Sequence, residues 1–96
     1  MNRVVVYSNI AKLDLKGIRD YIAEHNPSAA VSVLIQIKEE CRQLGSMPFA
    51  GPAYGESHPG LRFRVVGKYV VFYRVTDDRV WIQRVLHSAR DFGKLL

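Results

Sequence analysis

The sequence predicts an α+β fold in which a helical hairpin packs on a small, mainly antiparallel sheet. Three observations lead to this fold class: a short β-branched run opens the chain, two helical apolar stripes follow it, and three strand-like runs come last. The expected element order is β-α-α-β-β-β in two layers. Ninety-six residues are enough for one modest core, so we expect a single domain over residues 1–96.

The first half of the chain supplies one strand and two helices. Residues 3–7 are a β-branched run that predicts a strand, and Ser8 follows as a helix N-cap. Asn26 is expected to cap the second helix, Pro27 to occupy its first position and Gly45 its C′ position. The short link between the helices implies an antiparallel hairpin. The two apolar stripes are Ala11, Leu15, Ile18 and Ile22, then Ala30, Val33, Leu34, Ile37, Cys41 and Leu44.

The second half is expected to form a loop followed by a three-stranded meander. The loop, residues 46–60, is rich in proline and glycine and has a length that is often functional. The first strand of the chain is expected to join the sheet beside one of the later strands. The later strands are expected at 61–65, 69–75 and 80–87, with turns at 67–68 and 76–79 and a helical turn around 89–92.

Alternation along these strands predicts which side chains share a face of the sheet. Arg62 and Arg64 alternate with apolar residues, which predicts one cationic face on the strand at 61–65. In the strand at 80–87, two sets are expected on opposite faces: Val80, Ile82, Arg84 and Leu86 on one, and Trp81, Gln83, Val85 and His87 on the other.

The positive charge is concentrated in the second half of the chain. Residues 49–96 hold eight Lys and Arg against four Asp and Glu, a net charge of +4, whereas residues 1–48 hold six against five, a net charge of +1. Such a field favours a nucleic acid, a nucleoprotein complex or an acidic protein segment as partner. A basic surface that only keeps the protein soluble is the alternative.

Several classes of protein are excluded by what the sequence lacks. No apolar run approaches the ~18–20 residues of a membrane span, and the first residues do not resemble a signal peptide, so we expect a cytoplasmic protein without membrane contact. Cys41 lies on an apolar stripe, where a core role is favoured over a nucleophile. The three histidines lack ligand spacing, and no glycine motif cradles a phosphate. We therefore expect neither a metal nor a cofactor.

Arginines and one histidine are the candidate contacts for an anionic target. Guanidinium groups bind phosphates through two parallel hydrogen bonds. Arg84 lies inside an apolar strand, where a charge is costly without a partner. Local pairing with Asp77, Asp78 or Asp91 is the alternative for each arginine. The predicted target-binding residues are Arg62, Arg64, Arg74, Arg84, His87 and Arg90.

RNA cleavage by attack of a 2′-hydroxyl is the enzymatic alternative. It requires a base, an acid for the leaving group and cations on the phosphate. Glu56 or His87 could act as the base, and Arg62, Arg64 or Arg74 could hold the phosphate. The catalytic set under this hypothesis is Glu56, Arg74 and His87, although nothing in the sequence fixes Glu56 near His87.

An ordered set of motifs along almost the whole chain resembles one family, the ParE branch of the RelE/ParE superfamily of bacterial type II toxins. Each motif alone is weak, and the ordered set, above all its last two members, is fairly specific. The motifs are Asp14-Leu15-x-x-Ile18-x-x-Tyr21-Ile22, Asn26-Pro27-x-Ala29-Ala30, Leu44-x-x-x-Pro48-x-x-Gly51, Pro59-Gly60-Leu61-Arg62, Tyr69-Val70-Val71-Phe72-Tyr73-Arg74-Val75 and Val80-x-Ile82-x-Arg84-Val85-Leu86-His87-x-Ala89-Arg90-Asp91.

The resemblance implies a plasmid- or chromosome-borne toxin that is encoded with a cognate antitoxin in a plasmid-stabilisation system. The antitoxin is expected to wrap the toxin and form a hetero-oligomer with it. ParE members act on DNA gyrase and block replication, whereas RelE-type relatives cleave ribosome-bound mRNA, either with clustered Lys and Arg together with a Tyr or with a Glu and His set. This chain lacks the lysine cluster and the tail tyrosine of the RelE type. We therefore expect a gyrase inhibitor that acts by binding gyrase or a gyrase–DNA complex.

Two other functions stay open from the sequence. The first is a RelE-like, ribosome-dependent mRNA endonuclease, and the second is a basic interaction module without toxicity. The ParE branch has no agreed catalytic set to carry over, so target contact is expected at the strand end and tail. For residues 87–91 the alternative is a structural role, in which Asp91 pairs with an arginine and holds the tail in place.

Overall fold

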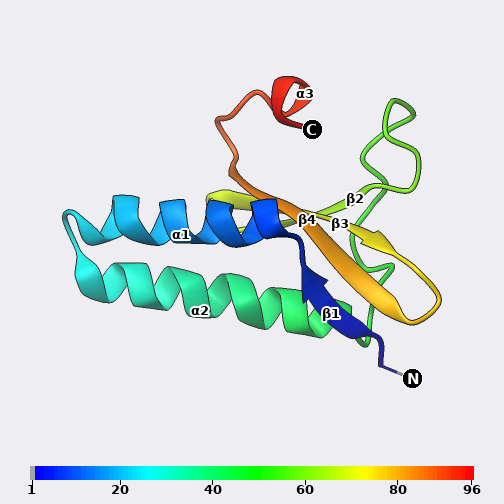
Figure 1. Cartoon of the computed structure of the whole chain (residues 1–96), viewed down its shortest axis with the longest axis horizontal. Coiled ribbons are helices and arrows are strands. Elements are labelled where there is room, and N and C mark those ends of the chain that lie inside the picture. The colour runs from blue at the N-terminus through cyan, green and yellow to red at the C-terminus, as the bar shows by residue number, and fades with distance from the viewer. Residues whose placement is uncertain (1) are drawn as a thin grey trace.

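A four-stranded sheet carries an antiparallel helical hairpin on one face in this computed structural model, which describes residues 2–96 (Figure 1). The predicted α+β class and element order are confirmed, with one short helix added at the end. No helix within the described residues is long and apolar enough to cross a membrane. The elements are β1 (Val4–Tyr7), α1 (Asn9–Ala23), α2 (Pro27–Leu44), β2 (Arg62–Val66), β3 (Tyr69–Val75), β4 (Arg79–His87) and α3 (Phe92–Leu95).

The strands lie in the order β1-β4-β3-β2, so the last strand of the chain is inside the sheet. β2, β3 and β4 form the predicted antiparallel meander. β1 pairs with β4 in parallel, which makes the sheet mainly antiparallel. β1 covers only the first part of β4, because its register runs from Val4 opposite Arg79 to Tyr7 opposite Ile82. Beyond Ile82, that edge of β4 faces α1.

The helix ends are held largely as the sequence predicts. Ser8 Oγ accepts a hydrogen bond from Ala11 N at 3.0 Å, and Asn26 Oδ1 accepts one from Ala29 N at 3.1 Å. Gly45 keeps a right-handed helical backbone with φ −61°, so no left-handed terminus forms. A Cβ on Gly45 would lie 2.7 Å from the carbonyl oxygen of Arg3. The glycine is therefore required by the close approach of α2 to the chain before β1.

The main core lies between the hairpin and one face of the sheet, which we call the helical face. The predicted stripes of both helices point into it, with Cys41 fully buried among them. Burial of this apolar surface is the chief stabilising term of the fold. The sheet contributes Val66, Tyr69, Val71, Tyr73, Val80, Ile82 and Val85, and the helices contribute Ala11, Leu15, Ile37, Cys41 and Leu44.

The opposite face of the sheet, here called the second face, has its own smaller core. No helix of the hairpin covers it. The loop between α2 and β2 and the C-terminal tail (residues 88–96) pack there instead, and Figure 1 shows both segments away from the hairpin. The second-face core is Leu61, Val70, Phe72 and Leu86, with Tyr54, Phe63, Phe92, Leu95 and Leu96 packed against it.

A β-bulge in β4 changes the faces expected from simple alternation. Phe72 pairs with Arg84 and Tyr73 pairs with Ile82, so Gln83 has no opposite residue in β3. The expectation that Val80, Ile82, Arg84 and Leu86 share one face is therefore wrong. Val80, Ile82 and Val85 face the hairpin, whereas Leu86 belongs to the second face. Arg84, opposite the second-face residue Phe72, lies on that side of the sheet.

Candidate functional site

The six predicted target-binding residues lie in three separate places. One pair is on β2 and faces the hairpin, one pair is on the second face, and one pair is where β4 runs into the tail. Arg62 and Arg64 share one face as predicted, but the six residues do not share one face of the sheet, because β2 and the bulged β4 present their arginines to opposite sides. The three pairs are Arg62 and Arg64, Arg74 and Arg84, and His87 and Arg90.

Arg62 and Arg64 hold the loop and α2 against β2. Arg62 Nη1 donates to the carbonyl oxygen of Gly51 at 2.7 Å, and its guanidinium lies 4.8 Å from the centre of the Phe49 ring. Arg64 forms an ion pair with Glu40 of α2, with 2.7 Å between Nη2 and Oε2. Both guanidiniums are thus partly occupied by internal partners, and their role in target binding stays a prediction.

Arg84 has the internal partner that its apolar strand requires. Its Nε donates to Asp14 Oδ2 at 2.9 Å and its Nη2 to Asp14 Oδ1 at 3.0 Å, which is a two-point ion pair. The remaining arm, Nη1, donates to the carbonyl oxygen of Leu95 at 2.8 Å. Hydrogen bonding to Asp14 raises the pKa of Arg84 above its ordinary value. Each arm of this guanidinium is therefore engaged inside the protein.

Asp14 and Ser8 also satisfy the edge of β4 that β1 leaves uncovered. Ser8 Oγ donates to the carbonyl oxygen of Gln83 at 2.8 Å, and Val85 N donates to Asp14 Oδ2 at 2.9 Å. Backbone groups at this depth are costly when they have no partner. The beginning of α1 therefore replaces a strand along this part of the edge, and Asp14 serves both the strand and Arg84.

Arg74 borders a small hollow on the second face, beside the loop and the tail. Its Nη1 donates to the carbonyl oxygen of Pro59, which ties the strand to the loop. The hollow has a volume of about 250 Å³, and His58 and Arg84 also line it. His58 contacts the ring of Tyr54 edge-on, with 5.6 Å between the ring centres. His58 is not one of the predicted site residues, because its place in the loop is the only signal for it in the sequence.

His87 and Arg90 lie at a groove between α1 and the end of β4. The groove has a volume of about 580 Å³. His87 Nδ1 accepts a hydrogen bond from Ala89 N at 3.0 Å, and the His87 ring meets the Tyr69 ring edge-on at 5.4 Å. Arg90 is exposed and forms no ion pair with the described residues. The groove is lined by Leu13, Asp14, Gly17, Ile18, Tyr21, Tyr69, Val85, Leu86, His87 and Arg90.

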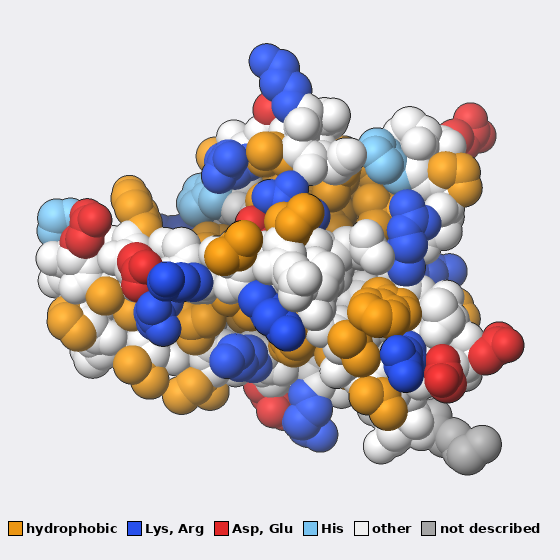
Figure 2. Space-filling model, viewed as in Figure 1, with side chains coloured by type: hydrophobic (Ala, Val, Ile, Leu, Met, Phe, Trp, Pro, Cys, Tyr) orange, Lys and Arg blue, Asp and Glu red, His pale blue; other side chains and the backbone are white. Residues whose placement is uncertain are grey.

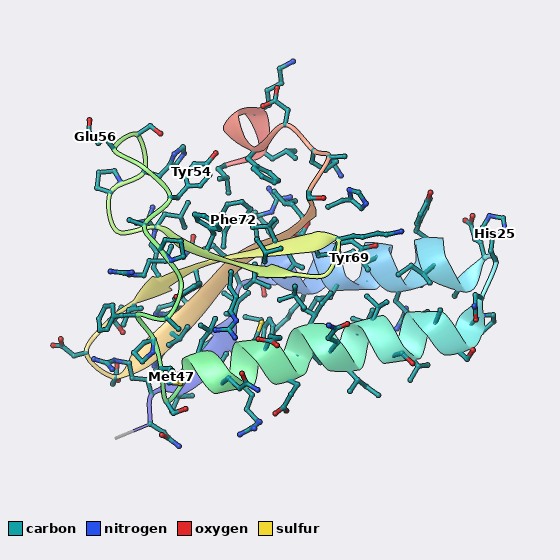
Figure 3. The ribbon with its side chains drawn as sticks, turned by 180° about the vertical axis from the view of Figure 1, so that it is seen from behind. His25, Met47, Tyr54, Glu56, Tyr69 and Phe72 are labelled. Atoms are coloured by element: carbon teal, nitrogen blue, oxygen red, sulfur yellow. The ribbon has the colours of Figure 1, made fainter. Side chains whose placement is uncertain are left out.

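Glu56, Arg74 and His87 are not brought together. Glu56 is exposed at the tip of the loop, and in Figure 3 it lies well away from Tyr69, the residue whose ring contacts His87. Along β3, His87 is opposite Tyr69 and Arg74 is five positions further on, which corresponds to about 17 Å. His87 and Arg74 also point to opposite faces. The three residues cannot act on one phosphate in this arrangement.

A second groove runs along the outer side of the hairpin and was not predicted from the sequence. It has a volume of about 570 Å³, and its apolar lining includes Val31, Leu34 and Ile35. Val31 and Ile35 are 58% and 62% exposed, and they lie off the core stripe of α2. Figure 2 shows basic side chains beside apolar ones over the hairpin. No carboxylate lines the groove, whereas four cations do, namely Lys12, Lys16, Arg19 and Lys38.

Comparison with solved structures identifies the class of protein to which this fold belongs. Among solved structures, the chromosomal ParDE toxin–antitoxin system from P. aeruginosa matches with a TM-score of 0.78 at 20% identity, covering 88% of this chain and 95% of the other. The RelBE2 toxin–antitoxin complex from Mycobacterium tuberculosis matches with a TM-score of 0.66 at 22% identity, covering 91% and 99%. The fold is therefore that of the RelE/ParE toxins.

The sequence comparison narrows this class. The family described as ParE toxin of type II toxin-antitoxin system, parDE, matches residues 5–92. A protein of Caulobacter vibrioides named Toxin RelE2 is 36% identical over 86 residues, which cover 90% of this chain and 96% of that protein. The chain belongs to the ParE toxin family of type II toxin–antitoxin systems.

Proposed function

We propose that this protein inhibits DNA gyrase by binding gyrase or its complex with DNA, and so blocks replication. The observation that carries the proposal is the separation of Glu56, Arg74 and His87, which leaves the catalytic set predicted for RNA cleavage unassembled. Membership of the ParE toxin family supports the same target. Inhibition by binding needs a complementary surface and no catalytic group.

The contact surface of the proposal is the groove at His87 and Arg90. Its rim holds an exposed arginine that has no ion-pair partner among the described residues, together with Leu13 and Tyr21, which are 67% and 71% exposed. An exposed arginine beside exposed apolar and aromatic side chains is typical of the residues that dominate binding energy in interfaces. Arg62, Arg64, Arg74 and Arg84 have internal partners and contribute to this surface less directly.

A ribosome-dependent mRNA endonuclease is the second candidate function. The name Toxin RelE2 of the relative that is 36% identical favours it. The second-face hollow, where His58 lies with Arg74, is the part of the molecule that could hold a phosphate. A basic interaction module without toxicity is the third candidate.

We also propose a cognate antitoxin as partner, docked on the outer groove of the hairpin in a cytoplasmic hetero-oligomer that serves plasmid stabilisation. Four cations surround an apolar lining that contains no carboxylate, which fits an acidic amphipathic segment. The solved relatives are themselves toxin–antitoxin systems, which supports such a partner.

The target classes are separated by inducing the protein without antitoxin in growing bacteria and following DNA and protein synthesis by short pulse labels. Under the proposal, DNA synthesis stops first, and purified protein inhibits supercoiling by gyrase. If protein synthesis stops first, the endonuclease function is correct, and His58→Ala and Arg74→Ala become the informative variants. If neither stops while the protein is expressed and folded, the third candidate remains.

The proposed contact surface has its own test in the supercoiling assay. We expect Arg90→Glu to weaken inhibition of gyrase by about tenfold or more, since it replaces a cation of the proposed contact surface by an anion that an anionic partner would repel. Lys94→Glu is the matched control, because it makes the same charge change at an exposed residue of the same tail. Equal inhibition by Arg90→Glu and the wild type would rule out this groove as the contact surface.

The antitoxin site is tested by the double variant Lys12→Glu/Lys16→Glu, with binding to the purified antitoxin measured by calorimetry. We expect a large loss of affinity at low salt, because two of the four cations at the groove are reversed. Lys68→Glu/Lys94→Glu reverses the same charge away from this groove and should bind normally. If both double variants bind equally well, the antitoxin docks elsewhere.

A further inference from the structure

We propose that Asp14 is a positioning residue, which acts through Arg84 to hold the C-terminal tail in the arrangement that target contact requires. The tail is residues 88–96, and it contains Arg90 of the proposed contact surface. The link runs from α1 through one guanidinium to the carbonyl oxygen of Leu95. The last step of the inference, that the held tail serves inhibition, rests on the proposed function.

The first step is that Asp14 fixes the direction of the Arg84 side chain. Two bonds of 2.9 and 3.0 Å join the carboxylate to Nε and Nη2, so the planar guanidinium cannot rotate without breaking both. The side chains of Asp14 and Arg84 are only 13% and 19% exposed, which limits competition from water for these hydrogen bonds. Asp14 is fixed in turn by Val85 N at 2.9 Å. This geometry directs Nη1, the arm of Arg84 that Asp14 does not bind, at the carbonyl oxygen of Leu95 in the tail.

The second step is that the tail has few other attachments. α3 has four residues, and Asp91 at its N-cap makes no side-chain capping bond. The Phe92 ring contacts the Phe72 ring edge-on at 5.0 Å, and Leu95 and Leu96 are only partly buried against the second-face core. A short helix without a cap is not stable by itself. The bond from Arg84 to Leu95 is therefore a large share of what holds the end of the tail.

The third step is that Arg90 lies between two fixed points. Ser88 N donates to the carbonyl oxygen of Lys68 at 2.8 Å, which fixes the start of the tail, and Arg84 fixes its end. Arg90 N donates to the carbonyl oxygen of His87 at 3.0 Å. Releasing the end of the tail would give the Arg90 side chain many more positions, and binding would have to restrict them again at an entropic cost.

The test combines hydrogen exchange of the tail with inhibition of gyrase supercoiling. Asp14→Asn removes the charge but keeps an amide oxygen that can accept from Val85 N. We expect faster exchange in residues 88–96 and about tenfold weaker inhibition. Asp20→Asn is the matched control, because Asp20 lies on the same helix and, among the described residues, pairs with Arg19 alone at the surface. It should leave both measurements unchanged.

Two further variants separate positioning from stability. Arg84→Lys keeps a charge for Asp14 but has no second arm for Leu95, so it should release the tail while the core stays protected. It also answers the question if Asp14→Asn does not fold. Phe92→Ala removes the other main attachment of the tail. If Asp14 acts through the tail, the losses of inhibition from Asp14→Asn and Phe92→Ala should be far from additive.

Several results would overturn the inference. One is unchanged exchange of residues 88–96 in both Asp14→Asn and Arg84→Lys. Another is a loss of inhibition from Asp14→Asn that is as large in the Phe92→Ala background as in the wild type. If the wild type does not inhibit gyrase, the proposed function fails, but the exchange measurements still decide whether Asp14 holds the tail.

Discussion

Among single residues, Tyr73 and Gly51 show how the loop is tied to the core. The Tyr73 side chain is fully buried, and its hydroxyl oxygen accepts a hydrogen bond from Gly51 N at 2.9 Å. A Cβ on Gly51 would lie 2.2 Å from the carbonyl oxygen of Phe63 and 2.7 Å from the Tyr73 hydroxyl. No other residue fits at position 51 without moving the backbone, so the glycine is required by this close approach.

Tyr73→Phe is expected to lower the free energy of unfolding by about 1–3 kcal/mol. The substitution keeps the apolar ring but leaves a buried backbone N–H without its partner. Urea unfolding followed by circular dichroism measures the change. Tyr21→Phe is the control, since Tyr21 is 71% exposed. An equal stability of the two variants would mean that water replaces the lost hydroxyl.

The sequence predicted that Arg84 needs a partner but could not identify it. An arginine in an apolar strand is costly alone, and this inference is confirmed by the ion pair with Asp14. The partner is 70 positions away, and the sequence pointed instead to Asp77, Asp78 and Asp91 because they are close in the chain. Only the packing of α1 along β4 makes the true pair, and nothing in one sequence reports that contact.

Among the elements, the helices were predictable because the spacing of their apolar residues and their N-capping residues indicate the same two helices. Ser8 and Asn26 cap α1 and α2 as expected, and the predicted stripes form the core. The β-bulge in β4 was not predictable, since the alternation of Val80 and Ile82 gives no sign of the extra residue at Gln83. Because of that one extra residue, Val85 lies on the helical face and Arg84 on the second face, the reverse of what simple alternation predicts. The helical turn expected at 89–92 forms three residues later, because Phe92 packs on Phe72.

Two glycines of the hairpin should respond in opposite ways to replacement by alanine. Gly17 lies in the middle of α1, and nothing is within 4 Å of a Cβ built on it, so Gly17→Ala should stabilise the protein by about 0.5–1 kcal/mol. Gly45→Ala should destabilise it, because the new Cβ would meet the Arg3 carbonyl oxygen at 2.7 Å. Thermal unfolding of both variants tests the pair, and a shift of the same sign in both would contradict it.

Across the whole molecule, buried titratable groups make stability depend on alkaline pH. Cys41 is fully buried between the hairpin and the sheet, and burial raises the pKa of its thiol to about 11. Burial also raises the pKa of Tyr7. The folded state therefore keeps these protons at pH values where the unfolded chain releases them. Stability is complete below the unfolded pKa and declines as pH rises through the folded one.

We expect the free energy of unfolding to fall between pH 9 and pH 11, by about 1–3 kcal/mol from the Cys41 thiol. Urea titrations at pH 8, 9, 10 and 11 measure the decline. Cys41→Val keeps an apolar side chain of similar size without an ionisable group, so its decline over this range should be shallower. Parallel curves for the two proteins would show that the thiol does not contribute.

The position of β4 in the sheet also determines when the sheet can form during synthesis of the chain. β1 is made before every other strand, yet its neighbour in the sheet is β4, which is made after β2 and β3. The sheet cannot close until residue 87 has left the ribosome, and the tail follows it. A nascent chain, or one that ends at a premature stop before Arg79, therefore lacks β4 and leaves β1 without its neighbour in the sheet.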